Sequence, residues 1–201
     1  MTNSVLSAGS PDDADRRLWL GAATVAGGAG LVATAVPFVA SLAPSEKARA
    51  LGAPVDVDLA SLRPGELRTV EWRGKPVFVL RRTPEMIDAL ARHDSLLADP
   101  QSRRSEQPET ARNALRSSRP DLAVIEAVCT HLGCVPGFRP TPGSPDIGAQ
   151  WPGGFYCPCH GSKFDLAGRV FKNVPAPTNL TVPPHRFLSE TVLLIGADPT
   201  A

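Results

Sequence analysis

The sequence predicts a mainly β protein that is attached to a membrane by one N-terminal helix. An uncharged run from Leu18 to Ser45 is long enough to cross a bilayer as a helix, which needs about 20 apolar residues. From Pro54 onward, short segments alternate apolar and polar residues, as half-buried strands do. The 21 prolines, the 17 glycines and an aromatic share of only 5% favour a loop-rich β domain over a helical one.

The size and charge of the chain limit its possible functions. Its 201 residues suit one membrane segment followed by one domain of about 150 residues. A formal net charge of +1 gives no electrostatic reason for nucleic-acid binding. We therefore expect no nucleic-acid partner.

The first part of the chain is predicted to hold a tail and a membrane helix. We expect residues 1–17 to form a polar cytoplasmic tail and residues 18–42 to form a single transmembrane helix. Pro37 and Pro44 are expected to kink this helix and to end it. A buried helix of a soluble protein would show a polar face, and this segment shows none.

Arg16 and Arg17 allow two interpretations. As positive residues beside a membrane helix, they place the N-terminus in the cytoplasm. As part of Asp-Arg-Arg-Leu-Trp-Leu, they also resemble a twin-arginine export signal, which moves folded domains across a membrane. No small-residue cleavage site stands out, which favours a retained anchor over a removed signal peptide. The sequence leaves the export signal open.

After a charged linker at residues 43–54, the pattern becomes that of a β domain. A short helix is predicted from Pro84 to Arg92, with Thr83 as its N-cap. Strands are predicted at 55–59, 67–72, 76–80, 121–128, 187–188 and 191–196, with a hairpin at 164–170.

Two longer stretches are predicted to be surface segments. Residues 99–120 are polar and charged, which indicates a solvated excursion without chemistry of its own. Residues 132–156 are rich in Gly and Pro and are predicted to form extra surface loop. His93 receives no ligand role, and His185 is expected to be a surface histidine.

Two short motifs hold all four cysteines and two of the four histidines, namely Cys-Thr-His-Leu-Gly-Cys at 129–134 and Cys-Pro-Cys-His-Gly-Ser at 157–162. Each supplies one Cys and one His that can bind a common metal centre: Cys129 with His131, and Cys157 with His160. Two Cys and two His suit a [2Fe–2S] cluster in which imidazoles replace thiolates on one iron. Because imidazole is neutral, such a cluster accepts an electron more easily than one with four thiolates.

A four-coordinate Cys₂His₂ zinc site is the alternative, because spacing alone does not identify a metal. Each motif also carries a second cysteine, Cys134 or Cys159, so the candidate ligands outnumber the four that zinc needs. A disulfide between Cys134 and Cys159 would account for the excess and tie the two loops together. Pairing all four cysteines would leave the histidines without thiolate partners. We predict one disulfide and two thiolate ligands.

The two motifs resemble those of the Rieske iron–sulfur subunit of the bacterial quinol–cytochrome c oxidoreductase, the cytochrome bc complex. The family pattern C-T-H-L-G-C followed by C-P-C-H-G-S is met at every position. The resemblance implies an antiparallel β-sandwich Rieske domain at residues 55–201, with an inserted cluster-binding subdomain at about 128–178. It places this domain in the periplasm, anchored to the inner membrane. Residues 43–54 resemble the hinge that lets the domain swing between two docking sites.

The resemblance also implies an activity, that of a subunit of a translocating quinol–cytochrome c reductase. One [2Fe–2S] cluster per chain would accept an electron from quinol, with proton uptake at a ligand histidine, and pass it to a c-type haem. His160 would hydrogen-bond the quinone beside His131, so these two are the catalytic candidates.

Cytochrome b and a c-type cytochrome are the expected partners in a dimeric complex, because this chain has no C-x-x-C-H haem motif. An alternative is the Rieske small subunit of another oxidoreductase, such as arsenite oxidase. A soluble Rieske ferredoxin is disfavoured, because those proteins lack the second pair of cysteines and the anchor.

Further residues near the motifs take roles from the same resemblance. The hydroxyl of Ser162 would donate to a cluster sulfide, which stabilises the reduced state and raises the potential. Phe164 stands where high-potential members of the family have a tyrosine, so we expect a somewhat lower potential here. Pro175 and Pro177 resemble the proline loop that covers the cluster. Leu132 is expected at the exposed tip, where a docking partner would meet it.

Overall fold

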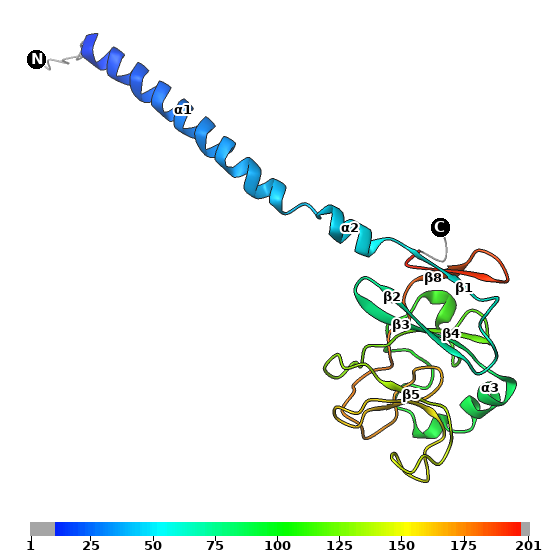
Figure 1. Cartoon of the computed structure of the whole chain (residues 1–201). Coiled ribbons are helices and arrows are strands. Elements are labelled where there is room, and N and C mark those ends of the chain that lie inside the picture. Colours follow the sequence, from blue (N-terminus) through cyan, green and yellow to red (C-terminus); the bar gives the residue numbers. More distant parts are fainter. Residues whose placement is uncertain (1–10, 198–201) are drawn as a thin grey trace, which may run out of the picture. The chain divides into compact units, whose positions relative to one another are not determined.

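The computed structural model describes residues 11–197 of the chain (Figure 1). The chain divides into two compact units between Arg49 and Ala50. Positions 1–10 of the predicted tail lie outside the described residues.

The first unit is dominated by a long helix, α1 (Pro11–Ser41). By length and composition, it supplies the one stretch in the described part of the chain that is suited to crossing a membrane. It starts before the predicted residue 18, so residues 11–17 are helical rather than tail. Proline is favoured at the first position of a helix, and the acidic Asp13 in the first turn complements the helix dipole.

The predicted linker contains a second, short helix, α2 (Glu46–Gly52). The Ser45 hydroxyl accepts a hydrogen bond from the Ala48 amide at 3.2 Å, which caps the first turn. Glu46 and Arg49 form an ion pair of 2.7 Å on its exposed surface. The segment is therefore an ordered turn of helix, although it buries none of its residues.

Up to residue 197, where the described residues end, the second unit contains three antiparallel sheets of three strands each, as the mainly β prediction requires. The first sheet has the order β1-β9-β8, the second β2-β3-β4 and the third β5-β6-β7. The strands are β1 (Val55–Asp58), β2 (Leu67–Trp72), β3 (Lys75–Arg81), β4 (Leu122–Glu126), β5 (Gly137–Arg139), β6 (Gly154–Tyr156), β7 (Lys163–Phe164), β8 (His185–Phe187) and β9 (Val192–Ile195). The helical elements are α3 (Pro84–Ala91) and two short 3₁₀ turns, η1 (Asp94–Leu96) and η2 (Glu109–Ala111).

The second sheet, β2-β3-β4, is buried on both faces, because its strands contribute to two separate cores. Along β3, Val77 and Val79 belong to a core shared with β1 and β9, whereas Phe78 and Leu80 belong to a core shared with β6 and β7. Alternate residues of a strand point to opposite faces, so one strand can serve both cores. The second core carries the third sheet, with Phe155 at its centre, and so supports both predicted metal-binding loops.

Local sequence signals set two of the connections. β2 and β3 are joined by Arg73 and Gly74, which both have positive φ (53° and 71°), as a tight two-residue hairpin turn requires. Thr83 accepts a hydrogen bond from the Met86 amide at 3.3 Å and caps α3. The cap was predicted, and the turn lies between the strands that were predicted at 67–72 and 76–80.

The expectation that residues 99–120 are a solvated excursion is wrong for several of them. Arg116 is only 1% exposed and donates to the carbonyl oxygens of Ala167 and Gly168. Burial lowers the pKa of this guanidinium to about 10. Asp99 is also buried, so this polar segment is part of the packed interior.

The stretch 132–156 is likewise more than loop. It includes β5 and β6, and Trp151 packs in a small buried cluster with Leu97 and Phe171. The indole N–H of Trp151 donates to the Arg139 carbonyl at 3.0 Å, which closes the excursion at its base.

His185 is buried, so its predicted surface position is wrong. It lies on β8, and its ring nitrogen Nδ1 is 2.8 Å from the Pro183 carbonyl oxygen. Burial lowers the pKa of His185, and the bond to Pro183 offsets only part of this effect. The folded protein therefore favours the neutral imidazole.

This burial predicts a pH dependence of stability. Because the pKa of His185 is lower in the folded state, stability is lost as the pH falls below the unfolded value of about 6.5, by at most about 1.4 kcal/mol per pH unit. Replacing His185→Asn keeps a donor toward Pro183 and should flatten this part of the curve. Denaturant unfolding of the detergent-solubilised chain from pH 8 to 5 would measure it, and parallel curves would contradict the assignment.

Candidate metal centre

The first motif forms a tight loop that follows β4. The Cys129 amide donates to the Cys134 carbonyl at 2.8 Å, and the Gly133 amide donates back to the Cys129 carbonyl at 2.9 Å. Gly133 has φ of 82°, a conformation that glycine adopts without strain. The loop thus holds the Cys129 side chain inward and leaves Leu132 70% exposed at its tip.

The second motif repeats the same backbone pattern after β6. The Cys157 amide donates to the Ser162 carbonyl at 2.8 Å, and the Gly161 amide donates to the Cys157 carbonyl at 3.0 Å. Gly161 again has a positive φ, 76°. The two loops therefore have the same backbone hydrogen bonds, and each presents the cysteine at the first position of its motif, Cys129 or Cys157.

The four predicted ligands differ in their exposure to solvent. The free thiols of Cys129 and Cys157 belong to residues that are only 2% and 1% exposed. The rings of His131 and His160 meet edge to face, with centroids 4.7 Å apart, and His160 is exposed. The site therefore combines buried sulfur with nitrogen at the surface.

Two features of these side chains fit a bound metal group. Burial raises the pKa of the Cys157 thiol, and a hydrogen bond with Cys129 also raises it. The Nδ1 atom of His131 is buried and has no hydrogen-bond partner among the described residues. A metal between the loops would deprotonate the thiols and satisfy this nitrogen. Thiolate and imidazole together suit iron–sulfur clusters and zinc.

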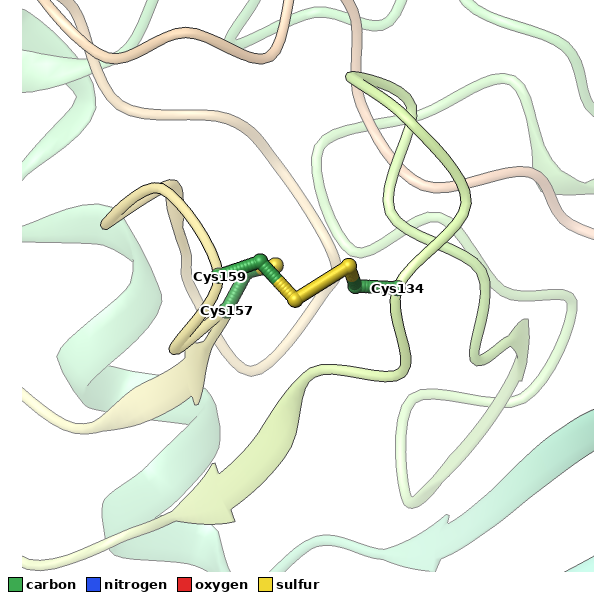
Figure 2. Close-up of side chains that lie close together, drawn as sticks. All are labelled: Cys134, Cys157 and Cys159. Atoms are coloured by element: carbon green, nitrogen blue, oxygen red, sulfur yellow. A yellow bond between two sulfur atoms is a disulfide. The ribbon is translucent and has the colours of Figure 1, made fainter.

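A disulfide between Cys134 and Cys159 connects the two loops (Figure 2). The Cys157 sulfur lies close to this bond, and the ligand atoms of the three cysteines are within 4.8 Å of one another. Since two of the three sulfurs are joined, only Cys157 of this group keeps a thiol. The predicted pairing is confirmed.

Residues 174–178, which we call the cover segment, lie against both loops. The Ala176 amide donates to the Ser162 hydroxyl at 3.1 Å, and the Thr130 hydroxyl donates to the Thr178 carbonyl at 2.7 Å. Ala176 is buried between the exposed Pro175 and Pro177. The Ser162 oxygen accepts from Ala176 and so keeps its own proton for another acceptor.

Sequence reasoning missed two supporting features of this site. Thr130 was passed over as motif filler, although its hydroxyl binds the first loop to the cover segment. Arg169 and Asp165 form a buried ion pair at 2.7 Å that closes the turn after the second loop, and Arg169 also binds Asp94 at 2.8 Å. The Asp-x-x-x-Arg spacing was the available signal for this pair, but nothing local indicates that both charges are buried.

The disulfide leads to a testable expectation. Replacing Cys134→Ser together with Cys159→Ser should lower the free energy of unfolding by about 3 kcal/mol, since a bridge across 25 residues constrains the unfolded chain. Denaturant unfolding with and without a thiol reductant would measure this. Reductant should destabilise the wild type and leave the double variant unchanged, and equal stability of both proteins without reductant would contradict it.

Comparison with known proteins gives a consistent result. The family model of the Rieske [2Fe-2S] domain matches residues 54–184. The ubiquinol-cytochrome c reductase iron-sulfur subunit of Allochromatium vinosum is 54% identical over 183 residues, which cover 91% of this chain and 88% of the relative. The subunit of the same name from Blastochloris viridis is 42% identical over 189 residues, with 92% and 94% coverage. Among solved structures, a chain of a hyperthermophilic respiratory Complex III is 28% identical, with a TM-score of 0.45 over 88% of this chain and 98% of that chain.

Proposed function

Since this chain belongs to the Rieske [2Fe-2S] family, as an iron–sulfur subunit of ubiquinol–cytochrome c reductase, we propose which residues carry its electron-transfer role. The chain is a subunit of an oxidoreductase complex of the respiratory chain, and its cofactor is a [2Fe–2S] cluster. The observation that carries the residue assignment is the pair of matched loops, each with one free buried thiol and one imidazole.

Cys129 and Cys157 are the thiolate ligands, and His131 and His160 are the imidazole ligands. His131 would bind through Nδ1, its buried nitrogen without a partner, which leaves its other nitrogen facing outward. When bound, the cluster supplies one-electron exchange at a potential raised by its neutral ligands. The Ser162 proton, free of Ala176, is available to donate to a cluster sulfide.

The imidazoles have a second task at the surface. His160 is exposed, so its free ring nitrogen can hydrogen-bond a quinol and hold the proton that the quinol gives up. Leu132 in the first loop and Pro175 and Pro177 in the cover segment are exposed apolar residues, which suits docking in a partner subunit. A quinol releases two electrons, so the second electron must go to another centre.

We assign the partner subunits and the orientation in the membrane from the family of the chain and from α1. α1 anchors the protein to the membrane. Arg16 and Arg17, at its N-terminal end, favour a cytoplasmic N-terminus and a periplasmic Rieske domain, at the bacterial inner membrane. The domain would begin near residue 55, after the linker at 43–54, with the cluster-binding subdomain at about 128–178. Cytochrome b and a c-type cytochrome are the proposed partners in a dimeric complex, as acceptors of the second and first electron.

Iron and sulfide analysis combined with EPR spectroscopy tests the ligand set. The purified, mildly reduced protein should contain two irons and two sulfides per chain and give a rhombic signal with a low average g value, typical of mixed His and Cys ligation. Cys129→Ser should lose this signal. A wild-type chain with one zinc and no signal would refute the assignment.

A second prediction concerns Phe164, which is completely buried on β7. The variant Phe164→Tyr adds a hydroxyl where tyrosine-bearing members of the family place a donor to a ligand sulfur. If this bond favours the reduced state by about 1 kcal/mol, the midpoint potential rises by about 40 mV. Redox titration of the EPR signal measures the shift. Phe187→Tyr on β8, in the sheet that carries no predicted ligand, is the control, and an equal shift in both variants would contradict the prediction.

A further inference from the structure

We propose that Asn179 is a positioning residue, which holds the cover segment over the metal-binding loops and thereby orients the Ser162 hydroxyl. Asn179 directly follows the cover segment and is only 1% exposed. It touches no predicted ligand among its hydrogen-bond partners, so its effect on the site would pass through the chain that it anchors.

The side chain of Asn179 makes three hydrogen bonds to the protein interior. Its Oδ1 accepts from the Val170 amide at 2.8 Å. Its Nδ2 donates to the Asp99 carbonyl at 3.0 Å and to the Ser102 hydroxyl at 3.1 Å. Since Val170 offers only a donor and the Asp99 carbonyl only an acceptor, the orientation of the amide is determined.

The segment to which Asn179 is bonded, residues 99–105, is held in place by its own hydrogen bonds. The Asp99 carboxylate accepts from the amides of Arg103 and Arg104, at 2.9 and 3.0 Å, and from the Ser105 hydroxyl at 2.8 Å. The Ser105 oxygen in turn accepts from the Asn179 amide at 3.2 Å. Asn179 is therefore attached through both its side chain and its backbone to a closed turn at residues 99–105.

The cover segment has few attachments of its own. Pro175 and Pro177 have no amide hydrogen, so only alternate residues can donate from the backbone. Besides the packing of Ala176 in the core, its hydrogen bonds to the loops, within the described part of the chain, are those from Ala176 to Ser162 and from Thr130 to Thr178. The anchor at Asn179 lies one residue beyond the second of these bonds. Its loss should free the cover segment to move away from both loops.

Such movement would change the Ser162 hydroxyl directly. Ser162 accepts from Ala176 with one lone pair, and this bond restricts the directions in which its own proton can point. Without Ala176 in place, the hydroxyl rotates freely and donates less often to the cluster sulfide. This last step rests on the proposed function, whereas the movement of the cover segment does not.

The test uses the full chain in its membrane complex and a matched pair of variants. Asn179→Leu has nearly the same shape and removes all three side-chain hydrogen bonds. Asn113→Leu is the control matched in the number of hydrogen bonds, though Asn113 is exposed: Asn113 also makes three such bonds, to Leu115, Ser117 and Thr110, and none reaches the cover segment.

Hydrogen–deuterium exchange of a peptide that covers residues 174–178 gives the first readout. In Asn179→Leu, exchange at Ala176 should become at least tenfold faster relative to the amides of β3 and β4, which report global unfolding. Asn113→Leu should leave this ratio unchanged. Exchange that rises only in proportion to the strands, or does not rise, would overturn the proposal.

The midpoint potential gives the second readout and separates the two steps. Asn179→Leu should lower the potential, and the shift should vanish when Ser162→Ala is already present. A shift of the same size in both backgrounds would overturn the role through Ser162. If Ser162→Ala alone leaves the potential unchanged, the hydroxyl assignment under the proposed function fails, while the exchange result still decides the role of Asn179.

A milder variant covers the case in which Asn179→Leu does not fold. Ser105→Ala removes the acceptor for the Asn179 amide and one donor to Asp99, but leaves the Asn179 side-chain bonds in place. It should accelerate exchange at Ala176 by a smaller factor in the same direction. No acceleration in a folded Ser105→Ala variant would overturn the proposed anchor.

Discussion

The structure depends on the need to hold two cysteine-bearing loops face to face at an exposed edge of the domain. Burial of apolar surface cannot do this alone, because the tip carries an exposed leucine and an exposed histidine. The loops are held by reciprocal backbone hydrogen bonds and by the disulfide between Cys134 and Cys159. These bonds are directional, so they fix the exposed tips of the loops, where packing has little to contribute.

The rest of the domain supports this arrangement from below. The core that contains Phe155 and Phe164 lies directly under the second loop, while β4 leads into the first. β3 connects this core with the one formed by β1 and β9, since its alternate residues point into each. The strands therefore fix where both loops begin and end. The disulfide between Cys134 and Cys159 then fixes how the two loops face each other. Because the strands and the disulfide share this task, the small sheet β5-β6-β7 can help to present the four predicted ligands.

Many of the strands, the helix cap and the ligand motifs could be predicted from the sequence, because each depends on residues that are close together in the chain. The hairpin at Arg73–Gly74 and the cap at Thr83 depend on neighbouring residues, and the ligand motifs are short. The buried polar residues could not be predicted, because partners distant in sequence decide whether a charge is buried. Arg116 is paired with carbonyls more than fifty positions away, and Asn179 binds a turn nearly eighty positions before it. Composition alone indicated solvent for residues 99–120, although the turn to which Asn179 is bonded lies within that range.

The unequal exposure of the ligands has a consequence for the reaction. If all four ligands were buried, an electron could enter the site but a proton could not follow without crossing an apolar region. Cys129 and Cys157 are buried, whereas the imidazole of His160 is open to a docking partner. Under the proposed ligand assignment, a quinol bound at this edge would meet a nitrogen that can hold its proton beside the centre that takes its electron. Because an added electron makes the site more negative, it also favours a proton on the nearby ring. With the proposed ligands, buried thiolates and the exposed imidazole of His160 would place proton and electron transfer at one surface.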